Sequence, residues 1–334
     1  MKTTAVSSTR GAPRLSRQRA QAGFTLIEMM IAVTIGLGML AGLVGVLATS
    51  SSNSRSNDRT AELMTNGRYA LDSMKDELRE AGFRGYTADP GLSAPGAMVV
   101  GNECLQAGAT AGSFVSNVRQ GVWGANDPGA DPFGGTCIPA GDFAAGNDIV
   151  AVRRAAAIPA AALAAGTVYL QSTYGQGQVF AGVAAPAFSG APAPLASFPV
   201  RAYVYYIRPW SISAAEVPQV PALVRVSLNA GGAMASELVA SGIEHMELRY
   251  GRLATDLSTQ YLDAGAGPLN ATSFDSSATP WEEVNSVRIW LLARNVTPEP
   301  GYQNTQTYTM GDQSYTVNDG FRRQMFTTVV QLRN

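Results

Sequence analysis

The chain has 334 residues, of which 46% are hydrophobic and 15% are charged, and its formal net charge is −1. This composition is that of a folded protein and excludes an intrinsically disordered chain. The near-neutral charge also argues against nucleic-acid binding by bulk electrostatics, so no nucleic-acid partner is expected.

The first predicted element is an apolar segment from Phe24 to about Thr49, in which Glu28 is the only charged residue. As a helix it would be about 39 Å long, which is enough to cross a bilayer core of about 30 Å with some tilt. All charged residues before it are basic, namely Lys2, Arg10, Arg14, Arg17 and Arg19. This asymmetry keeps the N-terminus in the cytoplasm and predicts a single-pass topology with a large exported domain.

Gly23 precedes the apolar segment, whereas an ordinary secretory signal has its small-residue cleavage site after the apolar core. Cleavage at Gly23 would remove the basic leader, residues 1–23, and keep the hydrophobic helix. The leader contains five of the 24 basic residues and none of the 25 acidic ones, so the remaining chain would be acidic. Glu28 lies four positions into the segment, where a carboxylate is either an interfacial residue that reaches the headgroups or a paired, functional one.

The hexapeptide Gly23-Phe-Thr-Leu-Ile-Glu28, followed by the apolar segment, resembles the class III signal of type IV pilins and type II secretion pseudopilins. The resemblance implies cleavage between Gly23 and Phe24 by prepilin peptidase, and N-methylation of the new Phe24 amine. It also implies that Glu28 pairs with the Phe24 amine of a neighbouring subunit and sets the stagger of subunits in a filament. A buried carboxylate and a buried ammonium are tolerable in lipid when each is the other's partner.

Helical periodicity continues beyond the apolar segment, and no proline occurs between Pro13 and Pro90. One helix over residues 24–82, with its membrane half at 24–49, is therefore expected, and Gly82 stands where a helix C-cap would be. Gly38 and Gly42 form a GxxxG pattern, which suits close helix packing but also reflects how common glycine is in membrane helices. Apolar and small residues recur at spacings of three and four at Leu63, Gly67, Ala70, Leu71, Met74, Leu78 and Ala81.

The end of this helix resembles that of PilW-type minor pilins, in an Asn-Gly-Arg-Tyr-Ala-Leu-Asp element and an Arg-Glu-Ala-Gly-Phe-Arg-Gly turn. The resemblance continues in several later segments and leaves about 87–146 unmatched. It is carried by Asn66–Asp72, Glu77–Gly85, Pro221–Arg225, Glu237–Gly251, Val287–Arg294 and Arg322–Asn334. It implies the pilin architecture, in which a long helix, half in the membrane and half packed, precedes a globular head, here residues 83–334.

Residues from about 87 to 146 are rich in Gly and Pro and are expected to form extended loop with short strands. Cys104 and Cys137 lie here and are the only cysteines. In an exported domain, two cysteines most simply form one disulfide, and a metal or redox role is disfavoured. Asn126–Asp131 suggests a calcium loop but lacks the spacing and the closing Glu of an EF-hand. A turn is the favoured interpretation, and no metal site or cofactor is predicted.

The remainder is predicted to be mainly antiparallel strands, so the fold class is α+β. Ala155–Ala165 is mostly alanine and suggests a short helix despite Pro159, while Val183–Pro199 and Glu216–Pro221 are expected to be connectors. The predicted strands are Asp148–Arg153, Gly166–Gln171, Arg201–Arg208, Ala222–Leu228, Ile243–Tyr250, Val284–Arg294 and Phe321–Arg333.

Catalytic patterns are scarce in the sequence. His245 is the only histidine, so a catalytic triad or a histidine-ligated zinc site would have to use it. It lies within an alternating strand pattern, and no P-loop, HExxH or G-x-S-x-G motif occurs. We therefore expect a non-catalytic protein with no catalytic residues.

The function that the resemblance implies is that of a minor pilin, which joins a complex that primes type IV pilus assembly and sits at the pilus tip. Such a protein would be held in the inner membrane with a periplasmic head before it enters the pilus, whose functions include adhesion and twitching motility. The expected partners are other minor pilins, the major pilin, prepilin peptidase, the inner-membrane assembly machinery and a tip adhesin. Two alternatives stay open: a J-type pseudopilin of type II secretion and, less favoured, a membrane-anchored envelope enzyme.

Overall fold

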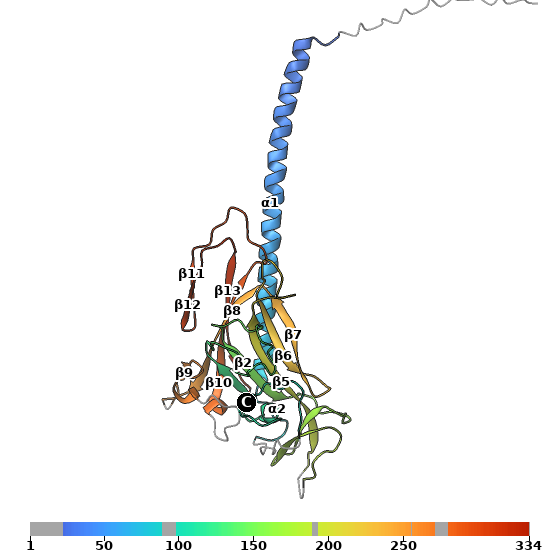
Figure 1. Ribbon diagram of the computed structural model, residues 1–334, viewed down its shortest axis with the longest axis vertical. Helices are drawn as coiled ribbons and strands as arrows, with labels where there is room; N and C mark the ends of the chain where they lie inside the picture. Colours follow the sequence, from blue (N-terminus) through green and yellow to red (C-terminus); the bar gives the residue numbers. More distant parts are fainter. Residues whose placement is uncertain (1–22, 89–97, 189–192, 255, 271–279, 334) are drawn as a thin grey trace, which may run out of the picture. The chain divides into compact units, whose positions relative to one another are not determined.

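The computed structural model describes residues 23–88, 98–188, 193–254, 256–270 and 280–333. Residues 1–22 of the predicted leader lie outside the described residues, as do residues 89–97 of the predicted loop region. Within the described residues, one long helix is followed by a head of antiparallel sheets (Figure 1). The predicted α+β class is confirmed.

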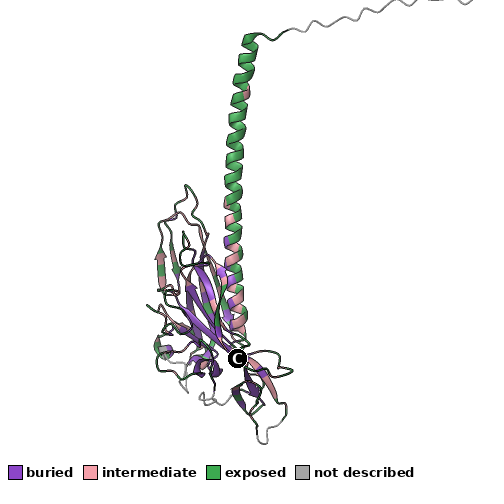
Figure 2. Ribbon diagram, turned by 45° about the vertical axis from the view of Figure 1, so that its right-hand side comes forward, coloured by how far each residue is buried: buried purple, intermediate pink, exposed green. Residues whose placement is uncertain are grey.

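Helix α1 spans Leu26–Arg79 without interruption, and no proline occurs along it. Among the described residues it is the one helix that is long and apolar enough to cross a membrane. Figure 2 shows that its N-terminal part is exposed, and its buried positions begin at Leu63. Gly82 follows the helix with a φ of 77°, a left-handed conformation that glycine adopts without steric cost.

The C-terminal part of α1 packs against the head through small and apolar residues at helical spacing. The contact is closest at Gly67, where a Cβ would lie 2.2 Å from the ring of Phe326 and would therefore clash with it. Ion pairs flank the contact, since Arg154 lies 2.7 Å from both Glu77 and Glu80. The periodicity seen in the sequence thus marks the face that packs on the sheet, at Leu63, Gly67, Ala70, Met74 and Leu78.

The larger sheet has seven antiparallel strands, of which β5 (Ala196–Arg208) is the longest. Strand β5 pairs with β2 along its middle, with β3 near its start and with β6 near its end. Such a long central strand holds together strands from across the sequence. The others are β1 (Val122–Ala125), β2 (Ile149–Ala155), β3 (Val168–Ser172), β4 (Gly177–Ala181), β6 (Ala222–Leu228) and β7 (Met234–Ser241).

The smaller sheet has four antiparallel strands in the order β13-β10-β8-β9, and a separate hairpin joins β11 to β12. Its strands are β8 (Ile243–Leu253), β9 (Thr259–Leu262), β10 (Val284–Arg294) and β13 (Arg323–Gln331), and the hairpin strands are β11 (Thr307–Met310) and β12 (Gln313–Thr316). The described part of the head also contains the short helices α2 (Ser113–Ser116), η2 (Gly267–Asn270) and η3 (Pro280–Glu283).

Aromatic side chains fill the space between the two sheets. Tyr250 on β8 packs against Trp281, with ring centroids 4.8 Å apart, and Trp281 lies beside Trp123 of β1. Gly124 of β1 faces the Tyr250 hydroxyl so closely that a Cβ there would lie 2.0 Å from its oxygen. The absence of a side chain at Gly124 therefore allows the two sheets to approach each other.

The structure corrects two predictions about local structure. Ala155–Ala165 is not a helix: Ala155 ends β2, and the backbone N–H groups of Ala156 and Ala160 donate to Pro199 and Ser197. Those bonds attach the segment to the start of β5, and they override the helical preference of alanine. The predicted connector 183–199 is also wrong at its end, because β5 begins at Ala196.

Cys104 and Cys137 form a disulfide in the structure, with Cα atoms 4.8 Å apart. Cys104 is fully buried, and the Leu105 N–H donates to the Thr136 hydroxyl beside the bridge. The bridge closes a separation of 33 residues in a region with little regular structure. It therefore ties together a region that has few backbone ladders of its own.

Removal of this disulfide is expected to lower the free energy of unfolding of the head by about 3 to 4 kcal/mol, since the unfolded chain regains the entropy of the open loop. Urea unfolding with and without reductant measures the change, and non-reducing mass spectrometry should find the chain two protons lighter than its reduced form. A Cys104→Ser, Cys137→Ser double variant is the control and should not respond to reductant. Two free thiols in the oxidised protein would contradict the prediction.

Candidate assembly site

The residues that the sequence predicts for processing and assembly lie at the N-terminal end of α1: Gly23 and Phe24 directly precede the helix, and Glu28 is in its first turn. The Phe24 side chain is 92% exposed. The backbone N–H and the hydroxyl of Thr25 donate to Glu28 Oε2 at 2.9 and 2.8 Å. The Glu28 N–H in turn donates to Thr25 Oγ1 at 3.3 Å. This reciprocal arrangement is a capping box, which satisfies free N–H groups in the first turn of a helix.

The capping box is a feature that the sequence reasoning missed, although its signal, Thr25-x-x-Glu28, lies inside the hexapeptide. It fixes the Glu28 carboxylate at the N-terminus of the helix, where the helix dipole favours negative charge. Among the described residues, Glu28 has no ion-pair partner. The contacts of the described residues therefore hold its negative charge in place but do not neutralise it.

The N-terminal part of α1 exposes apolar side chains on every side, from Leu26 to Leu47. Gly36, Gly38, Gly42 and Gly45 interrupt this surface, and a Cβ at any of them would meet no other atom within 4 Å. An apolar helix of this kind needs lipid or other apolar helices around it, and the glycines leave room for close approach. The surface can thus serve both as a membrane anchor and as a contact for neighbouring helices.

On the head, the loop between β5 and β6 presents two strongly exposed apolar side chains, Ile212 at 87% and Val217 at 94%. The Glu216 carboxylate fixes the loop, because it accepts the backbone N–H groups of Ser211, Ile212 and Val220 at 2.7, 3.0 and 2.9 Å. Desolvation raises the pKa of Glu216, but these backbone bonds outweigh it and hold the pKa at about 2. The loop is therefore an ordered apolar surface available to a partner.

His245 lies on β8 and stacks on Tyr315 of β12, with ring centroids 3.6 Å apart. Burial lowers its pKa to about 4, against a smaller opposing effect of Glu244, so the imidazole is neutral near pH 7. Glu244 itself pairs with Arg323 at 2.6 Å. His245 is thus placed as a packing residue of the strand.

Comparison with known families supports the features of both ends of the chain. Residues 18–44 match a family described as the prokaryotic N-terminal methylation motif, and residues 204–334 match one described as type IV pilus-assembly protein W, or PilW. The second match contains four of the segments on which the sequence resemblance rests, while Asn66–Asp72 and Glu77–Gly85 lie outside both matches. No curated protein matches the chain.

Among solved structures, the chain is similar to a type IV-like pilin from Thermus thermophilus. The two sequences are 13% identical, the similarity covers 83% of this chain and 95% of the other, and the TM-score is 0.33.

Proposed function

We propose that this chain, a type IV pilin-like protein of the PilW type, is a minor pilin that helps to start pilus assembly and is placed at the pilus tip. Prepilin peptidase would cut it between Gly23 and Phe24, and the new Phe24 amine would be methylated. The helix would first anchor the protein in the inner membrane, with the head in the periplasm. Other minor pilins and the major pilin would then contact it in the pilus.

The observation that carries this proposal is the start of α1. A capped carboxylate that has no cationic partner among the described residues stands at the beginning of an exposed apolar helix, one turn after the predicted cleavage site. In a bundle of such helices, the Phe24 ammonium of a neighbouring subunit supplies the missing positive charge. Pairing of Glu28 with that ammonium would fix the axial stagger between the two subunits.

The head would determine which subunits are neighbours. The exposed Ile212 and Val217 can bury apolar area against a partner, and Glu216 has already fixed their loop, so little conformational entropy is lost on binding. The partners on this side would be other minor pilins and a tip adhesin. The inner-membrane assembly machinery would act on the helix end.

A J-type pseudopilin of type II secretion is the second candidate, because the methylation motif and the long apolar helix serve that role equally well. The test is mass spectrometry of sheared pili and of secretion filaments from the native cell, combined with deletion of the gene. A small amount of this chain in pili, beginning at a methylated Phe24, supports the minor-pilin function. Its absence from pili, together with loss of protein secretion on deletion, would instead assign it to the secretion filament.

A further inference from the structure

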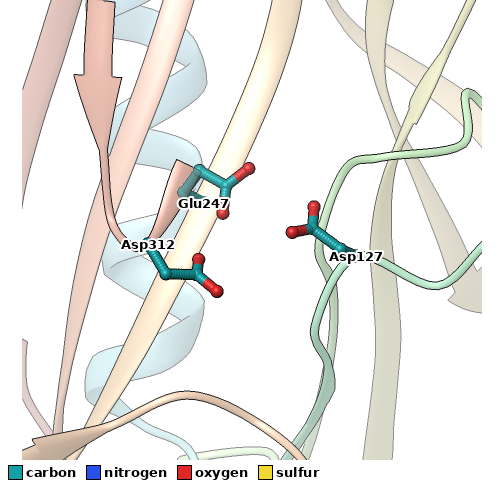
Figure 3. A group of neighbouring side chains, drawn as sticks. All are labelled: Asp127, Glu247 and Asp312. Atoms are coloured by element: carbon teal, nitrogen blue, oxygen red, sulfur yellow. The ribbon is translucent and has the colours of Figure 1, made fainter. Parts of the chain in front are cut away.

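Three carboxylates from distant parts of the head meet beside the β11–β12 hairpin. Asp127 follows β1, Glu247 lies on β8, and Asp312 lies in the two-residue turn between β11 and β12. Each offers a ligand oxygen, and these oxygens all lie within 4.8 Å of one another. Figure 3 shows the three carboxylates directed toward a common space between them.

Glu247 is the innermost member of this acidic cluster, which we define as Asp127, Glu247 and Asp312. Its relative exposure is 0%, and its Oε1 accepts the Tyr315 hydroxyl. Its Oε2 is buried and has no hydrogen-bond partner among the described residues. A buried carboxylate oxygen that accepts no hydrogen bond is unfavourable, and a bound cation would offset this cost.

Two further oxygens at this place are also buried without a partner, Asp127 Oδ1 and the neighbouring Asn126 Oδ1. The second oxygen of each carboxylate is already occupied by a surrounding donor. Gln313 donates to Asp127 Oδ2, and Asn126 Nδ2 donates to Asp312 Oδ2 at 3.1 Å. In metal sites, surrounding donors typically hydrogen-bond to one oxygen of a ligating carboxylate and so orient the other oxygen toward the metal.

The charge at the cluster is not balanced by nearby cations. Among the described residues, no Lys or Arg forms an ion pair with any of the three. Asp148, which is 1% exposed, adds a fourth carboxylate behind them and accepts the N–H groups of Asp127 and Leu248 at 3.0 and 2.6 Å. The cluster is therefore deficient in positive charge.

We propose that Asp127, Glu247 and Asp312 bind a divalent cation through their oxygens, with Ca²⁺ as the expected ion, and that this ion fastens the β11–β12 hairpin to the rest of the head. Oxygen ligands suit hard cations, and Ca–O distances of about 2.3 to 2.6 Å place two ligands on one ion up to about 5 Å apart. The site contains no Cys or His ligand, which disfavours zinc. Asp312 is exposed, so the ion and its water ligands can enter from solvent.

The sequence favoured a simple turn at 126–131, whereas the structure has bends there and places the turn at 132–135, directly after Asp131. Asp131 accepts the N–H groups of Phe133 and Gly135 at 3.0 and 2.7 Å and takes no part in the cluster. Gly311 is what brings the hairpin turn close. Its φ is 57°, and a Cβ there would lie 3.3 Å from the Glu247 Cβ. The cation site is thus formed by tertiary contacts and not by a sequential loop.

The test uses the full-length chain in detergent micelles, stripped with EDTA and dialysed. Calorimetric titration with CaCl₂ is expected to show saturable binding of one ion with a Kd of about 1 mM or lower. Thermal unfolding should shift to higher temperature in CaCl₂ relative to EDTA, because the ion binds the folded head. A titration without heat and an unfolding curve unaffected by CaCl₂ would overturn the proposal.

Matched variants separate ion binding from a structural role. Asp312→Asn should weaken Ca²⁺ binding by about tenfold or more. Glu247→Gln keeps the shape of the side chain, so it should be at least as stable as the wild type in EDTA and should no longer respond to CaCl₂. Asp76→Asn, an exposed carboxylate on α1 outside the cluster, should bind as the wild type does. Unchanged Ca²⁺ affinity in both cluster variants, or equal destabilisation of Glu247→Gln in EDTA and CaCl₂, would refute the site.

Discussion

Replacing Gly23 by leucine is expected to leave essentially all of the protein as the full-length precursor. The predicted cleavage site needs a small residue directly before Phe24, and leucine would place a branched side chain where the peptidase must approach the backbone. The leader with its five basic residues would remain attached and would keep the start of the helix at the cytoplasmic face. Mass spectrometry of the membrane fraction, with identification of the N-terminal residue, measures the processed fraction.

Gly36→Leu is the matched control, because it makes the same substitution inside the helix, where a Cβ at Gly36 meets no other atom within 4 Å. This variant should be processed as the wild type is. A Gly23→Leu protein that still begins at Phe24 would remove Gly23 from the processing site and would weaken the pilin assignment with it.

Glu28→Ala is expected to be processed normally but to give few or no pili that contain this subunit. The variant leaves the Phe24 ammonium of a neighbour without a counter-charge in an apolar surrounding. On insertion scales, such a charge costs about 3 kcal/mol near the centre of the membrane, equivalent to about a hundredfold in an association constant. The subunit content of sheared pili, measured by mass spectrometry against the membrane pool, reports the effect.

Glu28 has two roles that this variant removes together, since its carboxylate also caps the helix through Thr25. Glu28→Gln separates them, because glutamine can still accept the cap hydrogen bonds but carries no charge. Failure of both variants to assemble would assign the defect to the missing charge, whereas recovery in Glu28→Gln would assign it to the cap. Normal piliation in both would exclude Glu28 from assembly.

Local pattern was sufficient for the long helix and for seven of the thirteen strands in the described part of the head, and it missed β7 (Met234–Ser241) as well as the strands discussed below. The predicted bounds of Ala222–Leu228 and Val284–Arg294 agree with β6 and β10 residue for residue. Both segments are rich in residues that favour strands and are bounded by residues that favour turns, so the local sequence is enough to predict them. The course of α1 followed from its unbroken periodicity, and its end from Gly82. The capping box is also a local pattern, formed by Thr25 and Glu28. It was not predicted because Glu28 was interpreted as a charge within the membrane.

Short or polar strands could not be predicted in this way. Strands β1, β4 and β9 have four or five residues each, and the β11–β12 hairpin is made largely of polar residues that carry no apolar alternation. Whether such segments form strands depends on whether a neighbouring strand has unpaired backbone N–H and C=O groups with which they can pair. The alanine segment after Ala155 also depends on tertiary contacts. Its sequence favours a helix, but its backbone N–H groups bond to the start of β5.

The sequence by itself therefore determined the long apolar helix, the N-terminal methylation motif, the class of the fold and the two cysteines available to pair. The tertiary structure alone decided that Asp127, Glu247 and Asp312 meet, across separations of more than a hundred residues between the first and the other two. Periodicity and short motifs reflect only interactions between residues that are close together in the sequence. Which distant side chains share a space depends on strand order, register and the packing of two sheets, and these are set by the whole chain together.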